Sequence, residues 1–160
     1  IELGGTSLSI CEVPGHTPGS VVVLDERSNR LFTGDAIGSG YGVWMQTPTA
    51  VPLETYYESL VHLLKWLVDR GGRMTFHGGH RYQMFQSTHV PAFNPPSLGL
   101  LCDLIDLIDQ IVHGKIVGRI SNVDNIMELE PVLYAAYGRA EIQYKASNIK
   151  KRPDAVSAKV

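Results

Sequence analysis

The strongest constraint on the fold is a histidine enclosed by two Pro-Gly pairs, in the stretch VPGHTPGS at residues 13–20. Proline holds φ at about −65°, and glycine allows reversals of the backbone that other residues resist. Polar and apolar residues alternate just before this stretch, and a β-branched run follows it from Val21. The pattern predicts a rigid turn between two strands, which aims the ring of His16 in one direction.

The remaining patterns predict strands first and then strands alternating with helices, which favours an α/β (α+β) fold with a sheet covered by helices. Strands are expected at residues 7–13, 21–24, 31–33, 74–76 and 140–144, helices from residue 53 to Gly71 and from 97 to Gly114, a helical turn at 128–134, and loops at 38–50 and 81–96. The predicted core face of the first helix is Tyr57, Leu60, Leu64, Leu67 and Val68, and that of the second is Leu98, Leu101, Ile105, Ile108 and Val112.

Residue types that bind metals stand beside glycine at the ends of three predicted strands. They are His16 in PGHTPG, Asp35 in TGDAIG, and the pair His77 and His80 in FHGGH. Imidazole and carboxylate groups are the usual ligands of catalytic zinc and of non-haem iron. Each of these alone is weak evidence, but their recurrence after successive strands indicates a metal site.

These three motifs together resemble the second half of the metallo-β-lactamase-fold hydrolases, the superfamily that includes glyoxalase II. The resemblance covers residues 1–115 and implies half of a four-layer αβ/βα sandwich, in which helices cover one face of a mixed sheet. Residues 116–160 are then expected to be a subfamily extension that packs on the same domain.

The resemblance also implies roles for the site residues. His16 would bind the first metal, Asp35 would bridge both metals as the catalytic carboxylate, and His80, in preference to His77, would bind the second. Tyr41, Trp44, His77 and His89 are expected near the substrate. The implied cofactor is a pair of zinc ions, with iron or manganese as alternatives.

The family's His-x-His-x-Asp-His stretch, which supplies further ligands, has no counterpart in this chain. The histidines are His16, His62, His77, His80, His89 and His113, and no two are separated by a single residue. Because catalytic zinc needs about three protein ligands, we expect this chain to be the C-terminal half of a metallo-hydrolase and to be inactive alone. The alternatives are an iron-dependent oxidoreductase of the flavodiiron or sulfur dioxygenase type, and a non-catalytic binding module.

Composition narrows the partners. The formal net charge is −2 and the basic residues form no stripe apart from residues 150–152, so nucleic-acid binding is not expected. No apolar run is long enough to span a membrane, and the two distant cysteines fit a reducing, cytoplasmic location. Half of a sandwich leaves an apolar sheet face exposed, so the expected partners are the missing N-terminal half, a second chain or another copy, besides a small-molecule substrate.

Overall fold

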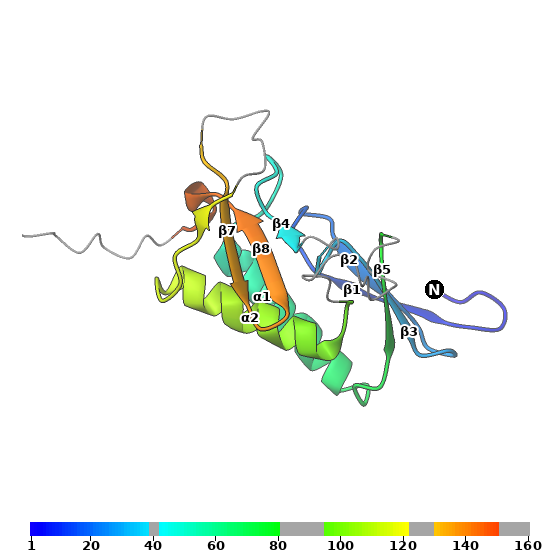
Figure 1. The fold of residues 1–160 in the computed structure, drawn as a ribbon. Coiled ribbons are helices and arrows are strands. Elements are labelled where there is room, and N and C mark those ends of the chain that lie inside the picture. The colour runs from blue at the N-terminus through cyan, green and yellow to red at the C-terminus, as the bar shows by residue number, and fades with distance from the viewer. Residues whose placement is uncertain (39–41, 81–94, 122–129, 151–160) are drawn as a thin grey trace, which may run out of the picture.

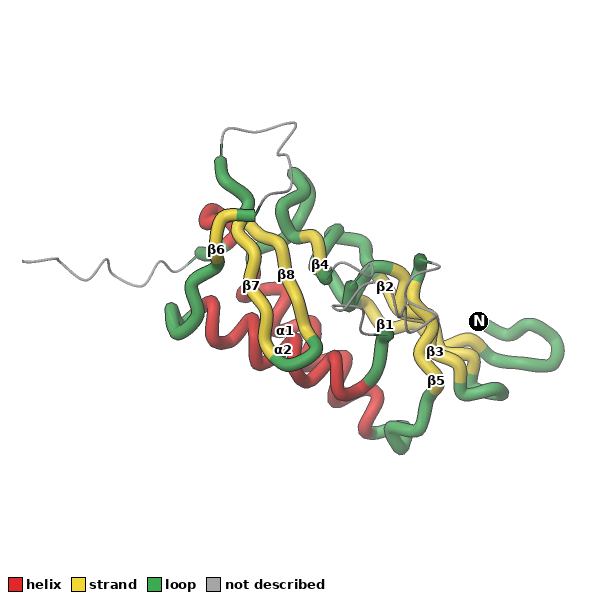
Figure 2. The backbone as a smooth tube through the Cα atoms, in the orientation of Figure 1, coloured by secondary structure: helices red, strands yellow, loops and turns green. Residues whose placement is uncertain are grey.

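The computed structural model describes residues 1–38, 42–80, 95–121 and 130–150, which form two mixed β-sheets and two long helices. The helices lie side by side, and β7 and β8 pack over α2 (Figure 1). This arrangement confirms the predicted mixed α/β architecture. The strands, however, divide into two groups rather than one (Figure 2).

The first sheet holds the predicted metal-binding motifs at its strand ends. Its order is β1-β2-β3-β5, with β1 at Leu8–Glu12, β2 at Val21–Asp25, β3 at Arg30–Gly34 and β5 at Thr75–Gly78. The pairs β1–β2 and β2–β3 are antiparallel, whereas β3 and β5 are parallel. Asp35 and His80 therefore follow parallel neighbouring strands and emerge at the same edge of the sheet.

The second sheet corrects two predictions. Its order is β4-β8-β7-β6, with β4 at Val43–Trp44, β8 at Ala140–Tyr144, β7 at Leu133–Tyr137 and β6 at Arg119–Ile120. The predicted loop at 38–50 thus contains a short strand. The predicted helical turn at 128–134 is wrong at its C-terminal end, because strand β7 begins at Leu133. Residues 122–129 lie outside the described residues. Pairing with β8 determines the conformation of β7, because Ala135 and Ala136 have little strand preference of their own.

The two helices confirm the predicted positions. Helix α1 is Leu53–Val68, and α2 is Leu98–Val112, whose N-cap Ser97 accepts a hydrogen bond from the Leu100 amide at 3.1 Å. A 3-10 turn, η2, follows at Ala146–Asn148. Neither helix in the described chain has the length and apolarity needed to cross a membrane.

The predicted core face of α1 is rotated by about one residue. The buried residues are Leu53, Tyr56, Ser59, Leu60, Leu63 and Leu67. Val68 is 58% exposed, and Tyr57 and Leu64 are only partly buried. The consequence is that Tyr56, rather than Tyr57, enters the core.

One face of the first sheet is apolar but uncovered by either helix. Ile10, Val23, Phe32 and His77 are consecutive register partners across its four strands. The opposite face carries Cys11, Val22, Leu24 and Leu31, which are buried in the core. By contrast, Ile10 and Phe32 are 47% and 46% exposed. The described chain therefore presents a row of apolar side chains beside the predicted metal-binding edge.

Candidate metal site

The turn that carries His16 is closed by its own backbone. The amide of Val13 donates to the carbonyl of Ser20 at 2.8 Å, and the amide of Gly15 donates to Thr17 at 3.1 Å. The hydroxyl groups of Thr17 and Ser20 are hydrogen-bonded at 2.9 Å. These bonds, together with the two prolines, restrict the turn as the sequence pattern predicts.

A residue outside the turn, Trp44, orients the ring of His16. Its Nδ1 lies 2.6 Å from the carbonyl oxygen of Trp44. A carbonyl oxygen only accepts, so Nδ1 carries the hydrogen and donates it. In the neutral ring Nε2 then holds the lone pair. Metal-binding histidines commonly donate their second ring nitrogen to a backbone carbonyl in this way.

Asp35 and His80 lie together at the end of β3 and β5. Nε2 of His80 is 3.1 Å from Oδ1 of Asp35, and both side chains are partly exposed. That Oδ1 atom is itself buried, and within the described residues it has no hydrogen bond of acceptable geometry. The ion-pair distance and the missing hydrogen bond are compatible, since an ion pair requires proximity but not alignment. A buried carboxylate oxygen that accepts no hydrogen bond has the chemistry of a metal ligand.

A bulge and a glycine bring the ends of these strands together. The parallel register passes from Phe32↔His77 to Gly34↔Gly78, so Thr33 is an extra residue on β3. Gly79 then donates its amide to the Gly34 carbonyl at 3.2 Å. A Cβ on Gly79 would lie 3.1 Å from Gly34 Cα, so a larger residue would push the strand ends apart.

Tyr56, which the sequence reasoning missed, connects the two turns. Its ring packs against Gly15, where an added Cβ would lie 2.3 Å from the ring. Its hydroxyl donates to the carbonyl of Ala36 at 2.6 Å, and burial raises the pKa of Tyr56 strongly above its usual value of 10.0. The sequence signal that could have placed Tyr56 in the core is the helical spacing of Leu53, Tyr56, Leu60, Leu63 and Leu67. One buried side chain therefore supports the backbone beside both His16 and Asp35.

The structure describes two of the four other predicted site residues. The His77 ring stacks on Phe32 with centroids 5.3 Å apart, and its buried Nε2 has no hydrogen-bond partner among the described residues. Trp44 contributes its carbonyl to His16, and its side chain is partly exposed. Tyr41 and His89 lie outside the described residues.

The donor chemistry of His16, Asp35 and His80 fits a divalent metal, but the described chain does not supply a complete site. Within residues 1–38, 42–80, 95–121 and 130–150, no group of three or more His, Cys, Asp or Glu side chains could hold an ion. Asp35 and His80 are in contact, and His16 is oriented separately by Trp44. Within the described residues, the predicted ligands therefore form only part of a metal site.

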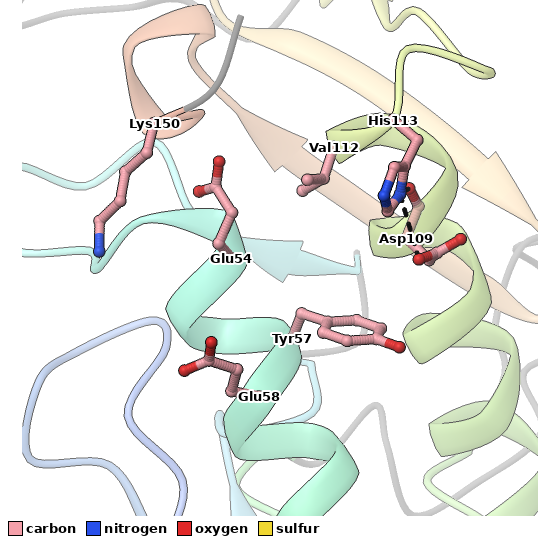
Figure 3. A pocket seen from close by; sticks show the side chains of 7 residues that line it. All are labelled: Glu54, Tyr57, Glu58, Asp109, Val112, His113 and Lys150. Atoms are coloured by element: carbon pink, nitrogen blue, oxygen red, sulfur yellow. Dashed lines mark hydrogen bonds and ion pairs between the residues drawn. The ribbon is translucent and has the colours of Figure 1, made fainter. Parts of the chain in front are cut away.

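A pocket elsewhere contains none of the predicted site residues. It has a volume of about 430 Å³ and is lined by Glu54, Tyr57, Glu58, Asp109, Val112, His113 and Lys150 (Figure 3). In Figure 3 the Tyr57 ring extends from α1 toward α2, where His113 Nδ1 lies 3.2 Å from a carboxylate oxygen of Asp109. This pocket lies between the helices, and neither Asp35 nor His80 lines it.

Mixed α/β layers with histidines and an aspartate at strand ends are the arrangement that the sequence predicts for a metal-binding hydrolase, and comparison with known proteins gives the family. The model of the metallo-beta-lactamase superfamily matches residues 1–81. The chain belongs to that superfamily. It is also similar to the acyl-coenzyme A thioesterase MBLAC2 of Gallus gallus, with 29% identity over 98 residues, covering 56% of this chain and 34% of the relative. The matched part of this chain thus spans about a third of the relative's length.

Proposed function

We propose that this chain is part of a metal-dependent hydrolase that cleaves thioesters. Membership of the superfamily and the similarity to an acyl-coenzyme A thioesterase support hydrolase chemistry. The observation that carries the metal assignment is the hydrogen bond from His16 Nδ1 to the Trp44 carbonyl, which leaves Nε2 available to a metal.

The residues that would hold the metal are His16, Asp35 and His80. A bound zinc ion lowers the pKa of water toward about 7 and polarises a carbonyl oxygen. The role of this chain's own residues is to hold the metal-binding side chains in place and to orient them. The Trp44 carbonyl fixes the ring of His16, and the Gly34–Gly79 contact keeps Asp35 beside His80.

The remaining ligands would come from a further β-sheet with an apolar face, which is neither of the two described sheets. We assign to it the surface formed by Ile10, Val23, Phe32 and His77, because Ile10 and Phe32 are 47% and 46% exposed there and His77 lies in the strand that leads to His80. The partial ligand set and the coverage of about a third of the relative both favour a covering segment from the same longer protein. A separate chain or a second copy would be revealed by the mass of the assembled species.

The test is thioester hydrolysis by the complete protein, with acetyl-coenzyme A as substrate and release of the free thiol as the readout. We expect turnover that a chelator abolishes and that zinc restores. His16→Ala should lose it, whereas His62→Ala, an exposed histidine on α1, should retain it. Chelator-resistant turnover, or equal activity of the two variants, would refute the proposal. Iron instead of zinc in the purified protein, with oxygen-dependent chemistry and no thiol release, would indicate an oxidoreductase.

A further inference from the structure

The carbonyl that orients His16 belongs to the second sheet, although His16 follows the first. Trp44 lies in β4, which is the edge strand of the order β4-β8-β7-β6. Its register partner in β8 is Gln143. The imidazole of His16 therefore hydrogen-bonds to the edge of a sheet whose other strands come from residues 119–144.

The direction of this carbonyl follows from the pairing of β4 with β8. The amide of Met45 donates to the carbonyl of Gln143 at 2.7 Å, so Met45 faces β8. Backbone groups of consecutive strand residues point to opposite sides within the sheet. The carbonyl of Trp44 consequently points away from β8 and toward His16, where it accepts the Nδ1 hydrogen.

Two further contacts keep β4 and the His16 turn in this relation. An added Cβ on Gly42 would lie only 2.5 Å from the carbonyl oxygen of Glu141 in β8, so the chain enters β4 in close contact with that strand. On the other side, the Thr47 hydroxyl donates to the backbone carbonyl of His16 at 3.2 Å. A displacement of β4 would therefore move the acceptor of the His16 ring.

We propose that the second sheet is a positioning element for the metal-binding imidazole, with Gly42 as the positioning residue that allows β4 to approach β8. The pairing of β4 with β8 selects the tautomer and the orientation of His16 through the Trp44 carbonyl. Only the description of His16 as a metal ligand rests on the proposed function. The coupling between β4 and the ring does not depend on it.

The experiment compares Gly42→Ala with Gly71→Ala by NMR of the imidazole nitrogens of His16. The two glycines have similar positive φ values of 78° and 85°, but an added Cβ at Gly71 would meet no atom within 4 Å. The backbone strain is thus matched, and only the contact with β8 differs. We expect wild type and Gly71→Ala to show the Nδ1–H tautomer with an observable Nδ1–H resonance, and Gly42→Ala to lose that resonance.

A Gly42→Ala variant that keeps the wild-type His16 spectrum would overturn the inference, as would an Nε2–H tautomer in the wild type. A second measurement needs no variant and covers the case in which Gly42→Ala does not fold. On gradual warming of the wild type, the His16 Nδ1–H and Met45 amide resonances should broaden together, because both bonds depend on β4. Loss of the His16 resonance well before that of Met45 would contradict the coupling.

Zinc affinity separates this inference from the proposed function. If His16 binds the metal, Gly42→Ala should weaken zinc binding of the complete protein by about 10-fold or more, as is typical when the second nitrogen of a metal-binding histidine loses its partner. A wild type with the Nδ1–H tautomer that binds no zinc would refute the proposed function while supporting the positioning role of β4.

Discussion

The hydroxyl of Tyr56 offers the sharpest test of how the candidate site is supported. Tyr56→Phe removes the 2.6 Å hydrogen bond to Ala36 while keeping the ring that packs against Gly15. Ala36 is only 1% exposed, so its carbonyl would lose its partner in a site that water does not reach. An unsatisfied buried polar group costs about 1–3 kcal/mol, and we take about 2 kcal/mol as the expected loss of unfolding free energy.

For a chain of this size, about 2 kcal/mol corresponds to a fall in Tm of roughly 4–8 °C. The assay is thermal unfolding followed by circular dichroism, with Tyr57→Phe as the matched control. Tyr57 is the next residue of α1, is only partly buried, and lies on the pocket side of the helix. A change below about 1 °C for Tyr56→Phe, or an equal loss in Tyr57→Phe, would refute the reasoning.

The same pair of proteins gives a pH test. Burial raises the pKa of Tyr56 above 10.0, so the folded state keeps the neutral phenol. Below pH 10 Tyr56 is neutral in the folded and unfolded states, and its contribution is complete. As pH rises above 10, ionisation favours the unfolded chain and wild type loses stability. Phenylalanine cannot ionise, so the difference in Tm between wild type and Tyr56→Phe should narrow above pH 10.

Other predictions concern the turns. Gly15→Ala should destabilise the chain by about 1–3 kcal/mol, because its Cβ would overlap the Tyr56 ring. In the control Gly19→Ala, in the same turn, the added Cβ meets no atom within 4 Å, so Tm should stay within about 1 °C of wild type. Equal Tm values would contradict the assigned packing. Hydrogen bonds led by that of Ser28 lower the pKa of Asp25 from 3.8 to about 2. Stability should therefore be complete above about pH 4 and fall as the pH approaches 2, and Asp25→Asn should show a shallower acid-induced loss in the same melts.

The local features of the site were predictable because short-range chemistry determines them. The Pro-Gly pairs around His16 require a turn, and Asp35 and His80 each stand beside glycine after a short apolar run that forms a strand. The extents of both helices could also be predicted, since Pro52 precedes α1 and Ser97 caps α2. Periodicity and capping act within a few residues, so the sequence expresses them directly.

The features that the sequence did not reveal depend on distant pairings. Strand β4 is two residues long and exists only because β8, about 100 positions later, pairs with it. The partner of His16 is a backbone carbonyl, which has no residue-type signature. To predict the role of Tyr56, the buried face of α1 must be located to within one residue, because a shift of one residue places Tyr57 in the core instead. These are tertiary effects that overrule or refine local preference.

Calorimetric titration of zinc into the complete protein tests whether His16 and Asp35 hold the metal. We expect a stoichiometric isotherm for wild type and for the exposed-histidine control His62→Ala. His16→Ala and Asp35→Asn should each weaken zinc binding by at least about 10-fold. Isotherms for these two variants that match wild type would contradict the assignment of the metal site.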